Sequence, residues 1–99
     1  MAKDVIKNMP YNLFVVVPDF DLPTVYGVVE FIQWDGQTLN SPYAAGRTTS
    51  RIGLCFSYQT TDGYASQLAF AVGNNKLFFR LRSPQGWKQW SELQFTSPS

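Results

Sequence analysis

The chain has 99 residues, enough for one domain but with no room for a second hydrophobic core. Hydrophobic residues make up 44% of it and charged residues 15%, a balance that excludes a disordered chain and indicates a packed globule. The net charge of +1, with basic and acidic residues interspersed, gives no electrostatic reason to expect nucleic acid or an anionic membrane as partner.

The N-terminal third predicts a lead-in followed by two strands. Residues 1–10 are polar and lack the apolar stretch of a signal peptide. The apolar, β-branched run 11–17 predicts a strand that the following proline ends. Residues 25–34 predict a second strand, closed by a tight turn at Asp35-Gly36.

Two segments of this part are expected to be irregular. Residues 19–24 contain two aspartates that can cap backbone amides in a turn. Residues 40–50 form the longest predicted loop. No window of the chain has apolar residues at helical spacing, so we expect little or no helix.

The C-terminal half predicts a meander of three strands, residues 51–59, 66–72 and 76–82, each with large apolar side chains at alternate positions. Pairing must bring these sets onto one face. A two-residue Asn-Asn turn does so between the last two strands, and a loop of three or five residues does so between the first two. The predicted core is therefore this face: Ile52, Leu54, Phe56, Tyr58, Leu68, Phe70, Val72, Leu77, Phe79 and Leu81.

The register fixes particular partners on that face. It places Phe70 between Phe56 and Phe79. The other pairs are Val72 with Leu54 and Leu68 with Leu81. The resulting fold class is all-β, a small antiparallel β-sandwich or partly open barrel built from hairpins. Three segments are expected: a lead-in over residues 1–10, a single β domain over 11–95, and a C-terminal tail over 96–99.

The opposite face of the meander carries small residues together with a phenylalanine and two arginines. A freely solvated face is not typically built this way, so we expect the N-terminal strands or another subunit to cover part of it. Arginine suits such a place because its stem packs while its planar fork meets carboxylates. Pairing within the fold is the favoured interpretation of the arginines, with Asp19, Asp21, Glu30 and Glu92 as candidate partners. The candidates for a subunit interface are Gln67, Phe78, Arg80 and Arg82.

Catalytic chemistry has few residues available. The chain has no histidine, which removes histidine-based triads and histidine-ligated zinc. Its one cysteine, Cys55, lies within a predicted strand and is interpreted as a small buried hydrophobe. Paired carboxylates leave a glycosidase open by residue type, but two of the acids, Asp19 and Asp21, lie in a turn where backbone capping is their ordinary use. We expect no enzyme, no cofactor and no metal.

Binding is better supported. Aromatic side chains in predicted loops stand beside amide, carboxylate and guanidinium groups, and a sugar presents an apolar ring face with a rim of hydroxyls. The candidates for glycan binding are Trp34, Asp35, Asn40, Tyr43, Arg47, Asp62 and Tyr64. The alternative is that the tryptophans Trp34, Trp87 and Trp90 belong to the core, and of the three Trp90 is the one we most expect to be buried. Trp87 and Trp90 are three residues apart, so in a regular strand they would point to opposite faces unless a bulge intervenes.

A series of motifs between residues 19 and 93 resembles the knob domains that end the tail fibres of contractile-tail bacteriocins and many bacteriophages. The motifs are the Asp-Phe-Asp-Leu-Pro-Thr phrase at 19–24 with Tyr26-Gly27-Val28, the Leu39-Asn40-Ser41-Pro42 loop, the strand at 77–82, and Trp87-x-x-Trp90-x-x-Leu93. Two features depart from the pattern. Val28-Val29 stands where a tyrosine often closes the opening phrase, and the apolar segment 11–17 has no counterpart.

The resemblance implies the tip of a phage tail fibre or tailspike, presented to the bacterial surface on the virion. It implies a homotrimer attached to the rest of the fibre, with host lipopolysaccharide or capsular polysaccharide as receptor. Two alternatives stay open, a purely structural module that trimerises the fibre and a free-standing lectin-like β domain. If the domain recognises a host, we expect the contacts in the loops at 34–47 and 62–64 rather than in the closing tryptophan motif.

Overall fold

The computed structural model describes residues 14–22 and 26–93, and within these ranges it confirms the all-β class. No described residue lies in a helix, and accordingly none of the described chain forms a helix long and apolar enough to cross a membrane. The strands are β1 (Val15–Val16), β2 (Val29–Trp34), β3 (Gly53–Gln59), β4 (Ala65–Ala71), β5 (Leu77–Ser83), β6 (Gly86–Trp87) and β7 (Ser91–Leu93).

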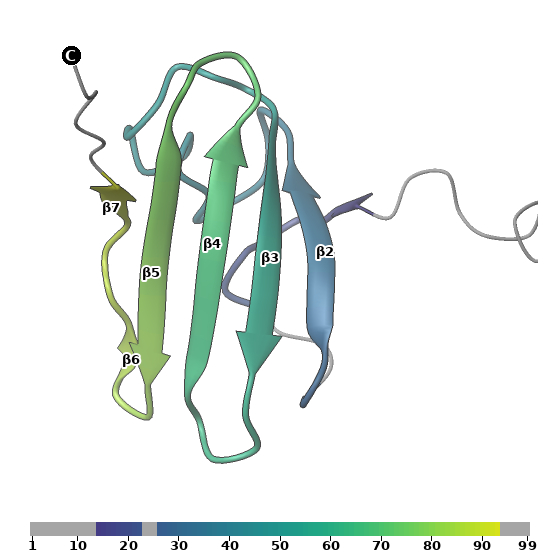
Figure 1. The fold of residues 1–99 in the computed structure, drawn as a ribbon, viewed down its shortest axis with the longest axis vertical. Coiled ribbons are helices and arrows are strands. Elements are labelled where there is room, and N and C mark those ends of the chain that lie inside the picture. Colours follow the sequence, from purple (N-terminus) through teal and green to yellow (C-terminus); the bar gives the residue numbers. More distant parts are fainter. Residues whose placement is uncertain (1–13, 23–25, 94–99) are drawn as a thin grey trace, which may run out of the picture.

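The strands form one open sheet in the order β1-β2-β3-β4-β5-β6, with β7 also pairing with β5 (Figure 1). Strands β2 to β5 are an antiparallel meander, which confirms the predicted meander of β3 to β5 and adds β2 at its side. The sheet is nevertheless mixed, because β1 runs parallel to β2. After β1 the described chain crosses behind the sheet in the view of Figure 1.

The two hairpin turns fix the register. Gln59 pairs with Ala65, which leaves the five-residue loop 60–64 and confirms an odd loop there. The partner of Phe70 is Leu54 on one side and Leu77 on the other, so both predicted registers are wrong by two residues. A shift of two leaves every side chain on its predicted face.

The β4–β5 turn is longer than the predicted Asn-Asn turn because loop residues hold it open. The Gly73 amide donates to Ser50 Oγ at 2.9 Å, and the Asn74 side-chain amide donates to Thr48 Oγ1 at 3.1 Å. The innermost backbone bond of the turn runs from Ala71 N to Lys76 O at 3.1 Å. The conformation of this turn therefore depends on its hydrogen bonds to the loop at residues 48–50 as well as on the pairing of β4 with β5.

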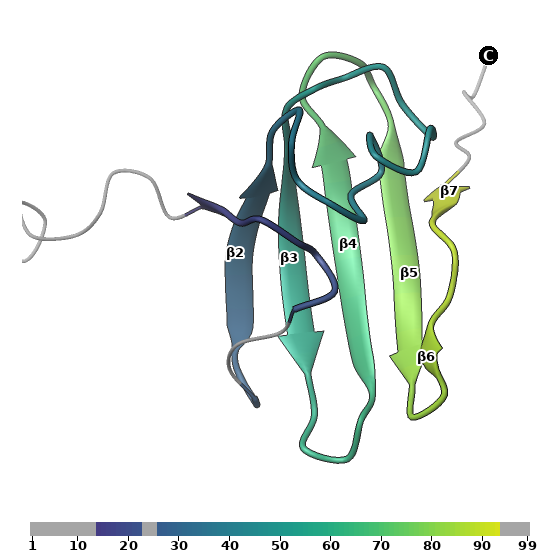
Figure 2. The same cartoon turned by 180° about the vertical axis from the view of Figure 1, so that it is seen from behind.

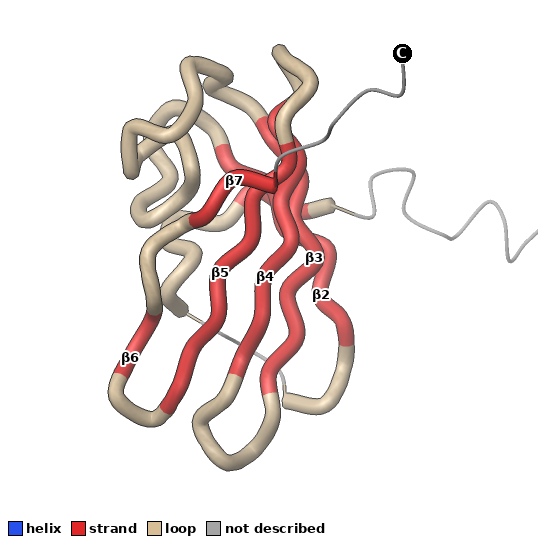
Figure 3. The backbone as a smooth tube through the Cα atoms, turned by 60° about the vertical axis from the view of Figure 1, so that its left-hand side comes forward, coloured by secondary structure: helices blue, strands red, loops and turns tan. Residues whose placement is uncertain are grey.

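The prediction of the core face is wrong. The buried side chains of the meander come from the face of small residues, whereas the large apolar face is open, with Leu68 37% and Leu81 52% exposed. Two loop segments, residues 17–22 and 35–50, lie across the small-residue face as a second layer (Figure 2). Figure 3 shows these loops gathered on one side of the strands. We call the two sides the covered face and the open face.

Small side chains on the covered face make room for aromatic rings that come from the first loop segment, from the end of β2 and from the chain between β6 and β7. The core consists of Phe20, Trp34, Cys55, Ala69, Ala71, Phe78 and Trp90. Phe20, from the first loop segment, packs edge-on against Trp34 and contacts Trp90, with ring centroids 6.0 and 6.3 Å away. Fully burying a large apolar side chain stabilises a fold by about 1.5–3 kcal/mol. A surface of small residues thus becomes the core because it accepts these rings.

Candidate functional site

A groove of about 410 Å³ lies on the covered side of the sheet, between the loop segment 40–47 and the chain that links β6 to β7. Its lining combines two indole rings with cationic, amide and carboxylate groups: Asp21, Asn40, Ala44, Ala45, Arg47, Arg80, Trp87, Lys88, Gln89 and Trp90. Among the hollows formed by the described residues, this one holds the most varied polar chemistry.

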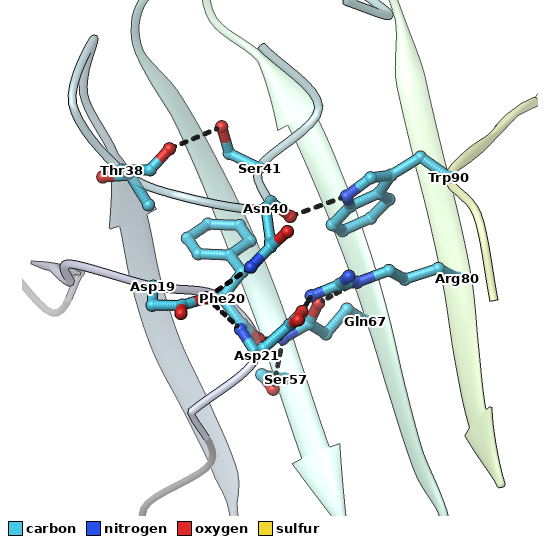
Figure 4. A network of polar contacts seen from close by, with 10 residues as sticks. All are labelled: Asp19, Phe20, Asp21, Thr38, Asn40, Ser41, Ser57, Gln67, Arg80 and Trp90. Carbon is cyan, nitrogen blue, oxygen red and sulfur yellow. Dashed lines mark hydrogen bonds and ion pairs between the residues drawn. The ribbon is translucent and has the colours of Figure 1, made fainter. Parts of the chain in front are cut away.

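Arg80 forms the floor of the groove. It lies in β5 with its side chain turned toward the loops and only 5% exposed (Figure 4). Its Nε donates to Gln67 Oε1 at 2.7 Å, and its Nη2 lies 2.9 Å from Asp21 Oδ1. Burial lowers the pKa of Arg80, and the nearby Asp21 carboxylate acts in the opposite direction. The guanidinium stays protonated, because arginine does not deprotonate in proteins.

Gln67 connects this arginine to the rest of the covered face. While its Oε1 accepts from Arg80, its Nε2 donates to the Phe20 carbonyl at 2.9 Å and to Ser57 Oγ at 3.2 Å (Figure 4). One buried amide therefore links β3, β4, β5 and the first loop segment. Both polar atoms of the Gln67 side chain thus have partners, and a buried hydrogen-bonded amide of this kind favours one arrangement of the elements it joins.

The two tryptophans flank the arginine. The Arg80 guanidinium carbon lies 4.0 Å from the ring centroid of Trp87 and 4.7 Å from that of Trp90, within the range of cation–π attraction. Both rings reach the same cation because regular pairing stops between β6 and β7. Trp90 is buried, as predicted, at 3% exposure, whereas Trp87 is half-buried.

Asn40 holds the loop over the groove. Its φ of 60° is left-handed, a conformation that asparagine tolerates better than most residues. Its carbonyl accepts a hydrogen bond from Trp90 Nε1 at 2.9 Å, and its side-chain amide donates to Asp19 Oδ1 at 2.9 Å (Figure 4). The same Asp19 oxygen accepts from the Asp21 amide at 2.8 Å, which confirms the predicted capping role of this aspartate.

The rim of the groove is cationic and amide-rich. The Arg47 guanidinium donates to Gln89 Oε1 at 3.2 Å across the groove, and both residues are exposed. Lys88 is exposed beside them. Asp21 is the one carboxylate in the lining and is paired with Arg80. Chemically, the groove offers hydrogen-bond donors and a fixed indole ring to a ligand with acceptor oxygens and an apolar surface.

Only two of the predicted glycan-binding residues, Asn40 and Arg47, line this groove. The prediction for Trp34 is wrong, since its side chain is completely buried and its Nε1 donates to the Ser50 carbonyl at 3.1 Å. Tyr43 is half-buried and packs against the core.

The other predicted glycan-binding residues lie away from the groove. Asp35 caps its own turn, with Oδ1 accepting from the Gln37 amide at 2.9 Å. Asp62 and Tyr64 belong to the β3–β4 loop and do not line the groove. The Asp62 carboxylate accepts a hydrogen bond from Thr60.

The residues predicted for a subunit interface lie under the loops. Gln67, Phe78 and Arg80 are buried by the chain itself, so the prediction that they meet a second subunit is wrong. Arg82 is half-buried, with its guanidinium 5.9 Å from the Trp87 ring centroid. The ion pair between Arg80 and Asp21 confirms that pairing within the fold explains the first of the two arginines.

The groove residues that the sequence reasoning missed are Asp21 as a lining group and the Trp87–Gln89 segment. One signal was present. The spacing Trp87-x-x-Trp90 required either two different faces or an interruption of the strand, and the interruption between β6 and β7 is what brings both rings together.

The fold and groove define a small all-β domain with one loop-covered sheet face and a tryptophan–arginine groove on that face. Comparison of the chain with family models, with curated proteins and with solved structures gave no match.

Proposed function

We propose that the chain is the tip domain of a phage tail fibre or tailspike. In this proposal it acts as a homotrimer on the virion and binds lipopolysaccharide or capsular polysaccharide of the host surface in the groove. Two lines support the proposal. One is the order of motifs that resembles the knob domains of such fibres, and the other is the chemistry of the groove that the closing motif lines.

The observation that carries the proposal is the half-buried indole of Trp87, held 4.0 Å from a buried arginine. A sugar ring has apolar C–H faces that pack on indole, and ligand sites commonly combine such surfaces with a few placed polar groups. Here Arg47, Lys88 and Gln89 surround the ring with donors for hydroxyl, carboxylate or phosphate oxygens.

The groove is also preorganised. Trp90 is fixed by its bond to Asn40, and Arg80 by Gln67 and Asp21. Ordering of side chains on binding costs about 0.5–1.5 kcal/mol for each flexible group. A groove whose floor is already fixed avoids that cost for Arg80 and Trp90, which supports ligand binding over a role as passive surface.

Titration of the full chain with purified lipopolysaccharide and capsular polysaccharides, followed by calorimetry and tryptophan fluorescence, tests the proposal. Trp87→Ala should weaken binding at least tenfold. Tyr26→Ala is the matched control, since this exposed aromatic precedes β2, on the other side of the sheet from β6, and should bind as wild type. Thermal melts establish that both variants are folded. A folded wild-type oligomer that binds no glycan across the panel would refute the receptor-binding proposal.

A second candidate function, a module that only assembles the fibre, is favoured by the large apolar open face of the sheet. The two candidates differ in the titration. An assembly module forms the oligomer and leaves every polysaccharide unbound.

A further inference from the structure

The open face of the sheet carries no charged side chain among the described strand residues. Register places on this side Val29, Phe31, Gln33, Leu54, Phe56, Tyr58, Ser66, Leu68, Phe70, Leu77, Phe79 and Leu81. Ile52 and Val72 flank the strands and are 49% and 60% exposed. In an antiparallel sheet with one side in water, the residues on that side are normally polar, whereas the residues on this side are mostly apolar.

The rings at the centre of this face form an ordered ladder. Phe56 lies between Phe31 and Phe70, with ring centroids 5.4 and 5.2 Å apart and the planes nearly perpendicular. Phe14 extends the ladder at one side, 5.4 Å from Phe31 and 5.7 Å from Phe56. Edge-to-face packing holds such rings in place. The face is therefore a rigid apolar surface and not a set of loose side chains.

The extent of the face matches an interface between subunits. Four strands at about 4.8 Å spacing, each about seven residues long, span roughly 20 by 20 Å. Such a surface is about 400 Å² when flat. Its large side chains, several of them 37–60% exposed, raise the accessible area toward the roughly 800 Å² per partner of a standard interface. Monomers rarely expose an apolar patch larger than a few hundred Å².

We propose that this open face packs against the open faces of further copies of the same chain. The absence of charge favours a second copy, because two identical neutral surfaces meet without leaving any charge unpaired. The covered face is already filled by the chain's own loops, so it offers no comparable apolar surface.

In the trimer, which rests on the proposed function, three open faces turn toward a common axis. Each face meets its neighbours through heterologous contacts. The grooves then lie on the outside of the assembly, because they are on the opposite side of each sheet. Self-association and ligand binding thus use separate surfaces and can be tested separately.

The test is the mass of the full chain in solution by sedimentation velocity and light scattering over a wide range of concentrations. We expect three times the chain mass of 11.2 kDa. Leu68→Glu places a charge at the centre of the face, where Leu68 pairs with Phe56 and Phe79, and should shift the mass to that of a monomer. Leu68 is already more than one third exposed, so the monomer should stay folded.

Leu39→Glu is the matched control, because Leu39 is 59% exposed but lies in the loop layer of the covered side. It should leave the oligomer intact. Leu81→Glu, a second change on the open face, should repeat the effect of Leu68→Glu. Groove binding by the Leu68→Glu monomer should keep the intrinsic affinity of each site.

The outcomes separate the two proposals. A dimer that Leu68→Glu dissociates supports the open face as interface and contradicts the trimer. A trimer that dissociates but binds no glycan also supports the interface, while it refutes receptor binding. A wild type that is monomeric throughout, or an oligomer that withstands both glutamate variants, overturns the inference. If deletion of residues 1–13 turns such a monomer into an oligomer, the chain's own N-terminal segment and not a second copy is the occupant.

Discussion

The two faces of the sheet differ in burial, and the size of their side chains does not predict which face is buried. The covered face presents alanines, a cysteine, a glutamine and an arginine, yet it forms the core. The open face presents phenylalanines and leucines and remains partly solvated. The difference teaches that burial follows what the rest of the chain brings. The rings of Phe20 from the first loop segment, Trp34 from the end of β2 and Trp90 from the chain between β6 and β7 need space over the sheet, and the small side chains of this face leave it.

Two neighbouring phenylalanines give the largest expected difference between the faces. Phe78 is completely buried on the covered face, and Phe79 is half-buried on the open face. Phe78→Ala should lower the free energy of unfolding by about 3–5 kcal/mol, the range for truncating a core aromatic. Phe79→Ala should lower it by about 1 kcal/mol. Urea unfolding at protein concentrations low enough for the monomer to dominate measures both without a contribution from association. Equal losses would mean that the faces are not distinct.

A glycine on the covered face gives the next effect. A Cβ built on Gly53 would lie 1.9 Å from the Trp34 ring, so the ring would have to leave its site. Gly53→Ala should destabilise the fold by about 3 kcal/mol, at the upper end of overpacking effects. At Gly36 the nearest atom to such a Cβ is the flexible Arg51 side chain at 3.8 Å, so Gly36→Ala should change stability by less than about 1 kcal/mol. Thermal and urea unfolding with tryptophan fluorescence distinguish the pair.

These positions show how far sequence reasoning reaches. Alternation correctly separated Phe79 from Phe78, predicted an odd β3–β4 loop and gave the bounds of β3, β4 and β5 to within two residues, but it did not predict β6 and β7. It assigned the core to the wrong side because the period of a strand defines two faces without saying which one is covered. The loop segments that cover the sheet contain no helix or regular strand, so hydrophobic periodicity in the sequence could not predict which face they cover.

The candidate site was predictable only in part, for a related reason. Asn40 and Arg47 were proposed from loop composition and do line the groove, but Trp87 comes from a strand end 40 residues later in the chain. Their meeting depends on Trp90 donating to the Asn40 carbonyl. A hydrogen bond between residues so far apart in the chain cannot be predicted from local sequence patterns. The buried state of Trp34 likewise depends on Gly53 beneath it.

Arg80 is the buried charged residue of the covered face, and its two partners, Gln67 and Asp21, are expected to contribute differently to stability. Its pair with Asp21 contributes modestly, because the paired atoms are buried but 36% of the Asp21 side chain is exposed, so solvent solvates the rest of the carboxylate. Arg80→Met should still lower the free energy of unfolding by about 2 kcal/mol, since it leaves the buried Gln67 Oε1 without its donor. Asp21→Asn should lower it by less than about 1 kcal/mol. Chemical denaturation of both variants measures the difference. A larger loss for Asp21→Asn would show that the ion pair, and not the glutamine bond, holds the network.

Cys55 gives the smallest effect near neutral pH, and it reports directly on the covered face. Burial raises the pKa of the Cys55 thiol from 9.0 to about 12, while the nearby Arg80 lowers it by a lesser amount. Below pH 9 the thiol is neutral in both states and its contribution to stability is fully present. Between about pH 9 and pH 12 the unfolded chain loses the proton and the folded chain keeps it, so stability should fall by about 1.4 kcal/mol per pH unit from this group.

The comparison with Cys55→Ala isolates that contribution, because tyrosines, lysines and arginines titrate alike in both proteins. Wild type should lose stability more steeply than the variant as the pH rises above 9, and the two should run parallel below it. At pH 8 the native thiol should react with a disulfide reagent only as fast as the protein unfolds. Rapid reaction of the folded protein would mean that the loop layer opens readily over β3. The covered face would then be a lid rather than a core, and the contrast between the two faces would rest on dynamics instead of packing.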